Sequence, residues 1–381
     1  MMNILLFGGG LQVLAIARGL VERGYAVDVI GGNNEISNKS RYIRKCINID
    51  FDHLCVENFI QMVNQAQYKV IIPTEDEYAL WLSANKAIIE QKSTAKCAVM
   101  DYETFSCVIN KTSFLEFLKK ENIPHPKTAL INVNYDEIAQ YVGFPALIKP
   151  SISAGARGIK IVNNINDLKT FSTQIIEEYG ECSLQEYIND NSHYYNVMLY
   201  RTKNGLCQHY TITKIIRYYP IKGGSSSFCY TIENEKLLKI CADTLHRLNW
   251  VGFADFDVLE KGDGDYRIIE INPRVPASIK AAYVSDVNFG EIIVCDTLGH
   301  DIPSYSYKTG KQLRYLGLDI AWFIASPDRW RCKPNWFIFF SKNLHYQEGG
   351  IHDLKAMIAS IWVGIKKQLN PKFRKSKSGM N

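Results

Sequence analysis

The stretch Arg267-Ile-Ile-Glu-Ile-Asn-Pro-Arg274 carries more chemistry than any other part of this chain. Glu270 and Asn272 lie two residues apart within an apolar run, so both side chains leave the same face of a predicted strand. A second strand pattern, Gly252-Phe-Ala-Asp-Phe-Asp-Val-Leu-Glu260, comes just before it, and Lys261-Gly-Asp-Gly-Asp265 between them is typical of a hairpin turn. The sequence therefore predicts a β-hairpin with acidic side chains on one face.

The register of this hairpin predicts a cation site. If the turn is centred between Asp263 and Gly264, Asp257 lies directly opposite Glu270, because cross-strand partners are equally far from the centre. Two carboxylates in an apolar setting repel each other unless positive charge lies between them. A hard divalent cation with oxygen ligands meets that need, whereas the alternative is a surface hairpin with solvated acids.

The composition is that of a globular protein with two or three domains: 381 residues, 46% of them apolar and 22% charged. Ten cysteines are scattered without a C-x-x-C pair, which argues against a zinc site or a disulfide framework and favours a reduced, cytoplasmic setting. The first residues lack the basic segment of a signal peptide, and no apolar run reaches the ~18 residues of a membrane span.

The net charge of +5 hides an asymmetry along the chain. Residues 301–381 hold 14 Lys and Arg against 5 Asp and Glu, a net of +9, so the first 300 residues hold 30 against 34, a net of −4. The basic character therefore belongs to the C-terminal segment, and we expect no nucleic-acid partner for the chain as a whole.

The N-terminus predicts a Rossmann-like βαβ unit. Residues 3–7 form a strand pattern, Gly8-Gly-Gly10 follows, a helix runs from about Leu11 to Arg23, and Tyr25–Ile30 is the next strand. A dinucleotide fingerprint would need a third glycine where Val13 stands, and no acid ends the second strand. A different task for this domain is favoured, and an NAD(P)-dependent oxidoreductase is kept as an alternative.

Two further segments could contact a ligand. The acids in Pro73-Thr-Glu-Asp-Glu77 follow a strand at residues 68–72, so Glu75 either caps the next helix or faces a ligand at the end of that strand. Farther along, Gly143-Phe-Pro-Ala-Leu-Ile-Lys-Pro150 leads into the small-residue loop Ser151-Ile-Ser-Ala-Gly-Ala-Arg-Gly158. Backbone amides of such a loop can approach a phosphate while a lysine adds charge, although the pattern is no Walker A motif.

Six segments, in this order, resemble the ATP-grasp superfamily, in its carboxylate–amine ligase and carbamoyl-phosphate-synthetase-like branch, over about residues 1–300. They are Asn110-Lys111 with the helix after it, Phe144-Pro-Ala-Leu-Ile-Lys-Pro150, the loop to Gly158, Gln185-Glu-Tyr-Ile188, Gly252–Asp257 and Glu270-Ile-Asn-Pro-Arg274. The resemblance implies an α/β and α+β fold. We expect a Rossmann-like domain at 1–105, an ATP-grasp domain at 106–300 with subdomains at about 106–182 and 183–300, and a C-terminal extension at 301–381.

The resemblance also implies where MgATP binds. Lys111 and Lys149 would contact the phosphates, and the loop with Ser151, Ser153, Gly155 and Gly158 would close over them. Gln185, Glu186, Tyr187 and Ile188 would meet the adenine, with backbone groups of Glu186 and Ile188 as its partners. Asp257, Glu270 and Asn272 would hold one or two Mg²⁺ ions that arrive with the nucleotide.

The implied reaction is the activation of a carboxylate. Its oxygen attacks the γ-phosphate of ATP, and an amine or similar nucleophile displaces phosphate from the resulting acyl phosphate. Arg274 is the first candidate to stabilise that intermediate, and Lys214 and Arg217 are further ones. The substrates stay open between an amino acid and a sugar acid, and a kinase or a nucleotide-binding protein without ligase activity is a second alternative.

Three departures from the family pattern stand out. Many relatives have a glutamate that holds the ribose where this chain has Tyr194, and the loop has Ala154 and Ala156 where relatives often have glycine. In addition, Lys222-Gly-Gly-Ser-Ser-Ser227 predicts a flexible polar loop.

The C-terminal segment predicts an aromatic cluster and an amphipathic helix. Trp322, Trp330 and Trp336 group with Phe337, Phe339 and Phe340. Residues 351–369 then carry a helical apolar stripe with a Trp, and the tail after it is basic without an acid. Such a helix can bind an anionic membrane surface at the periphery, and the alternative is a core-packing helix with a solvated tail. We also allow for a homodimer.

Overall fold

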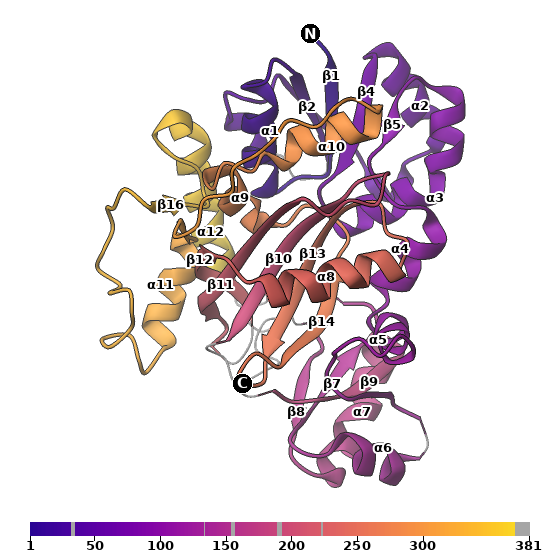
Figure 1. Cartoon of the computed structure of the whole chain (residues 1–381), viewed down its shortest axis with the longest axis vertical. Helices are drawn as coiled ribbons and strands as arrows, with labels where there is room; N and C mark the ends of the chain where they lie inside the picture. Colours follow the sequence, from indigo (N-terminus) through magenta and orange to yellow (C-terminus); the bar gives the residue numbers. More distant parts are fainter. Residues whose placement is uncertain (32–34, 133, 154–156, 189–192, 222–223, 370–381) are drawn as a thin grey trace.

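The computed structural model describes residues 1–31, 35–132, 134–153, 157–188, 193–221 and 224–369, and side chains up to residue 366. An N-terminal parallel sheet of five strands has the order β3-β2-β1-β4-β5 and lies at the top of Figure 1. Its elements are β1 (Asn3–Phe7), α1 (Gln12–Val21), β2 (Ala26–Gly31), η1 (Ser37–Lys39), β3 (Lys45–Asn48), η2 (Phe51–His53), α2 (Val56–Gln65), β4 (Tyr68–Pro73), α3 (Asp76–Lys92) and β5 (Lys96–Cys97). The predicted βαβ unit is therefore confirmed.

A small antiparallel sheet forms the lower part of the molecule (Figure 1). Its four strands have the order β6-β9-β7-β8, and apolar side chains of its two helices pack on one face. The elements are β6 (Thr128–Leu130), α6 (Tyr135–Val142), β7 (Ala146–Pro150), β8 (Lys160–Val162), α7 (Ile165–Tyr179) and β9 (Cys182–Glu186). The small-residue loop therefore joins two neighbouring antiparallel strands, β7 and β8.

A third sheet, of seven strands, fills the middle of the molecule in the order β14-β13-β10-β11-β12-β15-β16. One face packs on the amphipathic helix α8, and the other packs on α1 and α10 of the N-terminal layer. The elements are α4 (Tyr102–Ile109), α5 (Lys111–Lys120), β10 (Tyr194–Arg201), β11 (His209–Tyr219), β12 (Ser225–Ile232), α8 (Glu235–Arg247), β13 (Gly252–Glu260), β14 (Tyr266–Asn272), η3 (Ala277–Ile279), α9 (Lys280–Val284) and α10 (Phe289–Leu298).

The β13–β14 hairpin has the predicted pairing of Asp257 with Glu270, but its turn is centred elsewhere and a bulge restores the pairing. Asp257 lies opposite Glu270, as predicted. The turn itself is centred on Asp263, since Lys261 N–H donates to Asp265 O, and Leu259 pairs with Arg267. A one-residue bulge at Ile269 then shifts the register by the amount that the sequence estimate missed.

The C-terminal segment extends the large sheet. β15 (Gln312–Arg314) pairs with β12, and β16 (Leu344–Tyr346) pairs with β15. The remaining elements are α11 (Leu316–Ala325), η4 (Ile351–Asp353) and α12 (Leu354–Leu369). β12 itself starts at Ser225, so Ser225–Ser227 belong to a strand and the predicted loop is shorter than expected. Among the described helices, none combines the length and the apolar composition that crossing a bilayer requires.

A buried charge cluster attaches this segment to the sheet. Asp319 of α11 is fully buried and binds two guanidinium groups, with Arg217 Nε at 2.7 Å and Arg314 Nε at 2.6 Å. Arg217 also lies over the ring of Phe228, and Arg314 lies over the rings of Trp336 and Phe339. One carboxylate thus compensates two buried cations, and the three residues come from three different elements, β11, β15 and α11.

Replacing Asp319 should destabilise the protein strongly. Asp319→Asn leaves Arg217 and Arg314 buried without a counter-charge, which costs about 3–5 kcal/mol for a broken buried pair. We expect the free energy of unfolding in urea to fall by that amount. Asp328→Asn is the control, because Asp328 is exposed on the following loop and its replacement should stay within about 0.5 kcal/mol of the wild type. Equal stability of both variants would contradict the assigned role.

Candidate active site

Four polar side chains share one face of the β13–β14 hairpin. Asp257 lies opposite Glu270, and Asp255 lies opposite Asn272. The amide nitrogen of Asn272 lies 3.4 Å from a carboxylate oxygen of each aspartate. Asp255 was not among the predicted residues, although its position two residues before Asp257 on the same strand places both side chains on one face.

The charges of this cluster are unequal. Burial, and then the charge of Glu270, raise the pKa of Asp257 well above its usual range. Burial also raises the pKa of Asp255 to about 7, against the opposing effect of Arg274. Burial would raise the pKa of Glu270 too, but the ammonium of Lys111, 2.7 Å away, prevails and lowers it to about 2. The face therefore holds one carboxylate that stays ionised and two that resist ionisation.

The same face also contains a buried oxygen that suits a cation. Asp255 Oδ1 is buried and accepts no hydrogen bond from any described residue. A buried oxygen of this kind is a natural ligand for a hard cation. Within the part of the chain that the structure describes, no three Asp, Glu, His or Cys side chains converge into a complete metal-binding group. The cluster is thus an incomplete set of oxygen ligands, to which a bound ligand could add others.

Lys111 links the small-residue loop to the acids. It is the first residue of α5, after Asn110, whose side chain caps the helix by accepting from Ser113 N–H. The Lys111 ammonium bonds Glu270 and also donates to Ser153 O at 3.0 Å, and its backbone N–H donates to Ser151 O. The start of the loop is therefore held against this lysine.

The side chain of Ser151, at the start of the loop, is hydrogen-bonded within the protein. Its hydroxyl is buried and bonds Thr112 Oγ1 at 2.6 Å and Glu181 Oε1 at 2.8 Å. The predicted contact of Ser151 with a phosphate therefore does not agree with its hydrogen bonds. At the other end, Gly158 has φ +71°, and a Cβ there would lie 2.7 Å from Pro150 Cγ, so this position requires glycine. Gly155 lies outside the described residues.

Lys149 lies on β7 and is almost fully buried. Its ammonium donates to the side-chain oxygen of Gln185 on the neighbouring strand β9. Burial lowers the pKa of Lys149 to about 8, although the charge of Glu270 acts in the opposite direction. Two residues predicted for the phosphate and adenine regions are thus in direct contact, and an incoming anion would favour the protonated form of the lysine.

Some backbone groups of the predicted adenine-binding strand are already hydrogen-bonded within the protein. Glu186 N–H donates to Lys127 O, and its carboxylate forms an ion pair with Lys261. Tyr187 N–H donates to Pro145 O. The amide of Glu186 is therefore not available to a base, which leaves its carbonyl as the backbone group that could meet one. Ile188 is buried and is the last described residue before the gap at 189–192.

Arg274 lies where the N-terminal layer meets the large sheet. Its Nε lies 3.0 Å from Asp76 Oδ1, at the start of α3, and its Nη2 lies 3.4 Å from Asn272 Oδ1. Asp76 was not among the predicted residues. This arginine therefore borders both the acidic cluster and the carboxyl end of β4.

Glu75 makes a different contact from the helix cap considered above. It makes no capping hydrogen bond, and its carboxylate accepts from Gly9 N–H at 2.6 Å. Gly8 has φ +117°, and a Cβ there would lie 2.6 Å from Thr74 Oγ1, so the glycine turn fits closely against β4. A carboxylate of the chain thus occupies an amide that a dinucleotide phosphate would use, which weighs against the NAD(P) alternative.

Lys214 and Arg217 lie away from this face, so their predicted catalytic roles are corrected. Lys214 pairs with Tyr195, and Asp257 pairs with the next residue, Asn196; successive residues point to opposite faces of a strand. The Lys214 ammonium accordingly lies over the Tyr195 ring, 5.5 Å from its centre. Arg217 is held in the buried cluster with Asp319 described above.

Tyr194, at the position of the usual ribose-binding glutamate, is part of the acidic face. Burial, and then the charge of Asp257, raise the pKa of its phenol well above the usual value. A protonated phenol next to Asp257 can donate a hydrogen bond to that carboxylate. The residue that departs from the family pattern therefore serves the acidic cluster.

Comparison with known proteins assigns the class. Residues 108–278 match the family model of the ATP-grasp domain. The chain therefore contains an ATP-grasp domain, and the predicted resemblance is confirmed. D-aspartate ligase from Enterococcus faecium (strain Aus0004) is 22% identical over 332 residues, which cover 77% of this chain and 76% of that protein.

Solved structures share the fold. A biotin carboxylase–β,γ-ATP complex from Campylobacter jejuni superposes with a TM-score of 0.68 at 17% identity, covering 81% of this chain and 74% of that one. The ADP complex of N5-carboxyaminoimidazole synthetase from Staphylococcus aureus gives 0.66 at 16%, covering 80% of each chain. L-amino acid ligase from Bacillus licheniformis gives 0.61 at 11%, covering 78% and 74%. The predicted fold class is therefore confirmed.

The raised pKa of Asp255 should leave a signature in stability. Between about pH 4 and 7 the folded protein keeps a proton on Asp255 that the unfolded chain has lost, so stability falls as pH rises by up to about 1.4 kcal/mol per pH unit. Asp255→Asn should remove this contribution, which urea unfolding at several pH values would measure. Asp263→Asn, in the exposed turn of the same hairpin, should keep the wild-type slope. Identical slopes in all three proteins would contradict the prediction.

Proposed function

We propose that this protein is an ATP-dependent ligase that activates a carboxylate as an acyl phosphate and joins it to an amine. One observation carries the proposal: Lys111, Lys149 and Arg274 surround an acidic face that contains Asp255, Asp257 and Glu270. Phosphoryl transfer depends mostly on positioning and charge neutralisation, and this arrangement supplies both. The ATP-grasp domain and the ligases among the similar proteins support the same reaction.

The cations would bind the nucleotide phosphates. Lys111 would exchange its bonds to Glu270 and Ser153 O for phosphate oxygens, and Lys149 would gain an anionic partner in place of Gln185. Mg²⁺ held by Asp255, Asp257, Glu270 and Asn272 would neutralise charge on the phosphates, and the number of ions stays open. The relatives solved with ADP or MgADP support this use of nucleotide and metal.

The reaction would proceed in two steps. A carboxylate oxygen attacks the γ-phosphorus of ATP, the bond to the β-phosphate oxygen breaks, and ADP leaves. The amine nitrogen then attacks the acyl carbon, phosphate leaves, and the nitrogen loses a proton. Arg274 is positioned as the counter-charge for the acyl phosphate, because it lies between the acidic cluster and the N-terminal layer.

The substrates are proposed to include an amino acid. D-aspartate ligase and L-amino acid ligase, both similar to this chain, are named for amino acids. Glu75 and Asp76 add two carboxylates near Arg274 at the end of β4, and an ammonium group would complement them. A sugar acid is the alternative carboxylate.

Replacing Glu270 tests the metal and phosphate site. Glu270→Gln removes the one carboxylate that stays ionised, and we expect ATP-dependent phosphate release to fall at least about 100-fold. Release would be measured with a panel of amino acids and sugar acids as carboxylates, each with several amines. Glu103→Gln, on the exposed start of α4, should keep full activity. A folded Glu270→Gln protein with wild-type turnover would refute the assignment.

Ligand-induced stabilisation separates the ligase from the oxidoreductase. MgATP should raise the melting temperature, because binding to the folded state stabilises it by mass action, whereas NAD(P)H should have no effect. The reverse result would support the dinucleotide alternative. Phosphate release without any joined product would favour a kinase or hydrolase on the same fold.

The peripheral membrane contact and the homodimer remain separate proposals. They depend on surface residues of the C-terminal segment and not on the ATP site.

A further inference from the structure

Helix α12 buries small residues and exposes large apolar ones. The residues of α12 that are buried between Leu354 and Lys366 are small: Ala356 and Ser360 are 0% and 1% exposed, and Gly364 is buried. The large apolar residues on the other side face solvent, with exposed fractions of 54% for Leu354, 65% for Ile358, 58% for Trp362 and 41% for Ile365. Ile351, in η4 just before the helix, is 80% exposed. A helix that served only the core would turn these side chains inward.

The exposed face is firmly positioned. Just before α12, Asp353 accepts hydrogen bonds from Ser40 Oγ and Arg41 N–H of the N-terminal layer. Close by, Lys280 of α9 donates to the carbonyls of Tyr346 and Gly349. Along the helix, Gly364 packs close to Gly317 of α11. The small residues thus allow a close contact with the body of the protein, and the stripe of large residues is held outward.

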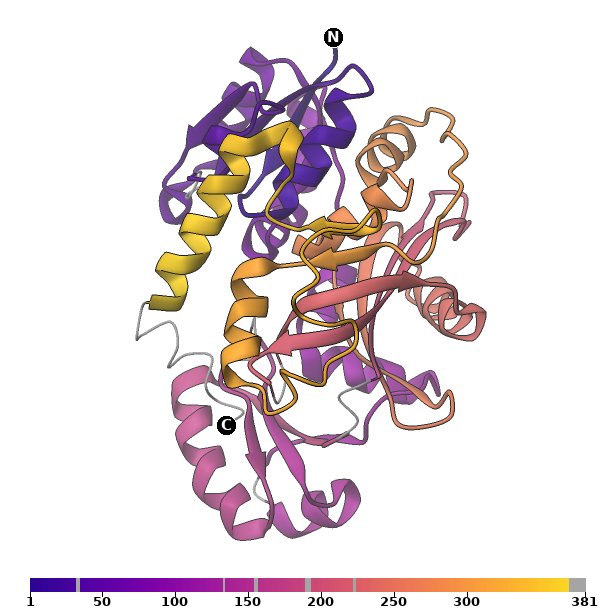
Figure 2. The ribbon, with the colours of Figure 1, turned by 90° about the vertical axis from the view of Figure 1, so that its left-hand side faces the viewer.

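A second exposed apolar region lies on the same side of the molecule. Figure 2 shows α11, α12 and the segment between them on this side. The exposed fractions are 71% for Ile324, 68% for Trp330, 54% for Phe337 and 94% for Phe340. Exposed apolar surface on this scale marks a site of interaction with a protein or a membrane.

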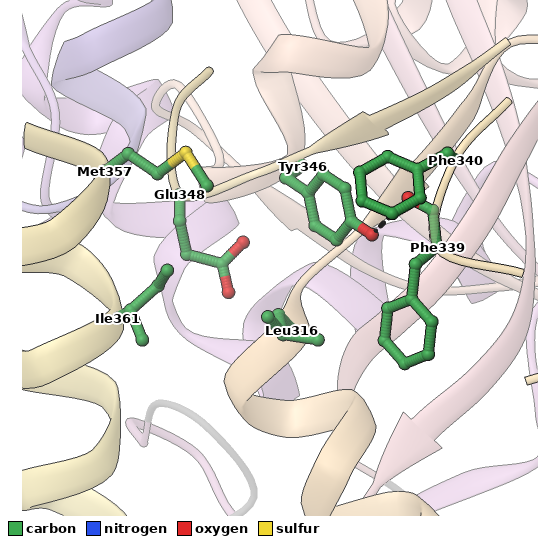
Figure 3. Close-up of a pocket in the computed structure, with 7 residues that line it drawn as sticks. All are labelled: Leu316, Phe339, Phe340, Tyr346, Glu348, Met357 and Ile361. Carbon is green, nitrogen blue, oxygen red and sulfur yellow. Dashed lines mark hydrogen bonds between the residues drawn. The ribbon is translucent and has the colours of Figure 1, made fainter. Parts of the chain in front are cut away.

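An apolar hollow of about 370 Å³ lies between the two regions. Leu316, Phe339, Phe340, Tyr346, Met357 and Ile361 line it, with Glu348 as the one carboxyl group in the lining (Figure 3). Burial raises the pKa of Glu348 to about 7, so this carboxyl group is less ionised near neutral pH than an exposed glutamate. The hollow therefore continues the apolar surface between α11 and α12.

The exposed charged groups of the C-terminal segment itself are mostly basic. Among the described residues from 320 to 366, the exposed or partly exposed cations are Arg329, Arg331, Lys333, Lys342, Lys355 and Lys366. Asp328 is the exposed acid in that range, whereas Glu348 is buried and Asp353 is hydrogen-bonded to the N-terminal layer. The partner that complements such a surface is apolar and negatively charged.

We propose that α12, together with the exposed aromatic segment before it, binds the surface of an anionic lipid bilayer. Trp362, Ile358 and Phe340 enter the boundary between headgroups and acyl chains, and Lys355 and Lys366 meet the acidic headgroups. A second copy of the chain fits less well, because a two-fold contact would bring the lysines of both copies together. The inference goes beyond the ligase reaction, which it places at a membrane surface.

Vesicle co-sedimentation of the full chain tests the proposal. We expect binding to vesicles of phosphatidylcholine with phosphatidylglycerol, and little binding to phosphatidylcholine alone. Ile358→Ser with Trp362→Ser should reduce binding at least about tenfold, because both exposed side chains lose their apolar insertion. Lys355→Glu with Lys366→Glu should also reduce it at least about tenfold, since each cation contributes roughly fivefold. Added salt should weaken the wild-type binding.

Leu206→Ser is the matched control, because Leu206 is 50% exposed in the turn between β10 and β11. It should bind vesicles like the wild type. ATP-dependent phosphate release, measured on every variant, shows whether the catalytic site is intact, so a failed ligase proposal and a failed membrane proposal are distinguishable. Equal sedimentation of all variants, or equal binding to neutral vesicles, would overturn the proposal. A dimer that Ile358→Ser with Trp362→Ser dissociates, without vesicle binding, would assign the surface to a second copy.

Discussion

The unfavourable pairing of Asp257 with Glu270 is the constraint on which the rest of the site depends. Two carboxylates opposite each other on neighbouring strands, with Asp255 beside them, cannot all ionise in a buried setting without cations. Two cations supply part of the compensation. Lys111 comes from α5, outside the hairpin, and Arg274 comes just after the end of β14. The positions of α5 and α3 relative to the hairpin are therefore fixed by charge as well as by apolar packing.

The pairing of the hairpin residues could be predicted from the sequence, because periodicity and charge were enough for it. Asp257 and Glu270 were paired correctly even though the turn estimate was wrong by one residue, because the bulge at Ile269 compensated for it. A bulge has no reliable sequence signal, since any residue can occupy it. Lys111 and Lys149 gained neighbours that agree with the predicted phosphate site, but that role itself stays a prediction.

The limits of the sequence-based predictions have a common physical origin. Lys214 and Arg217 looked like free cations on a strand, but the sequence does not say which face of β11 meets the acids, and the partner of Arg217 lies 102 residues away in Asp319. The C-terminal helix shows the same limit. Its amphipathic stripe was visible from the spacing alone, yet spacing cannot tell whether a stripe faces inward or outward. Only the packing of Ala356 and Ser360 decides that.

The buried cluster around Asp319 also has a consequence for the chain while it is being synthesised. β11 and β12 leave the ribosome well before β15 covers the edge of β12 and before Asp319 arrives to neutralise Arg217. Until then the growing chain carries an open strand edge, which favours aggregation, and a cation without its partner. The C-terminal segment thus both closes the edge of β12 and neutralises Arg217.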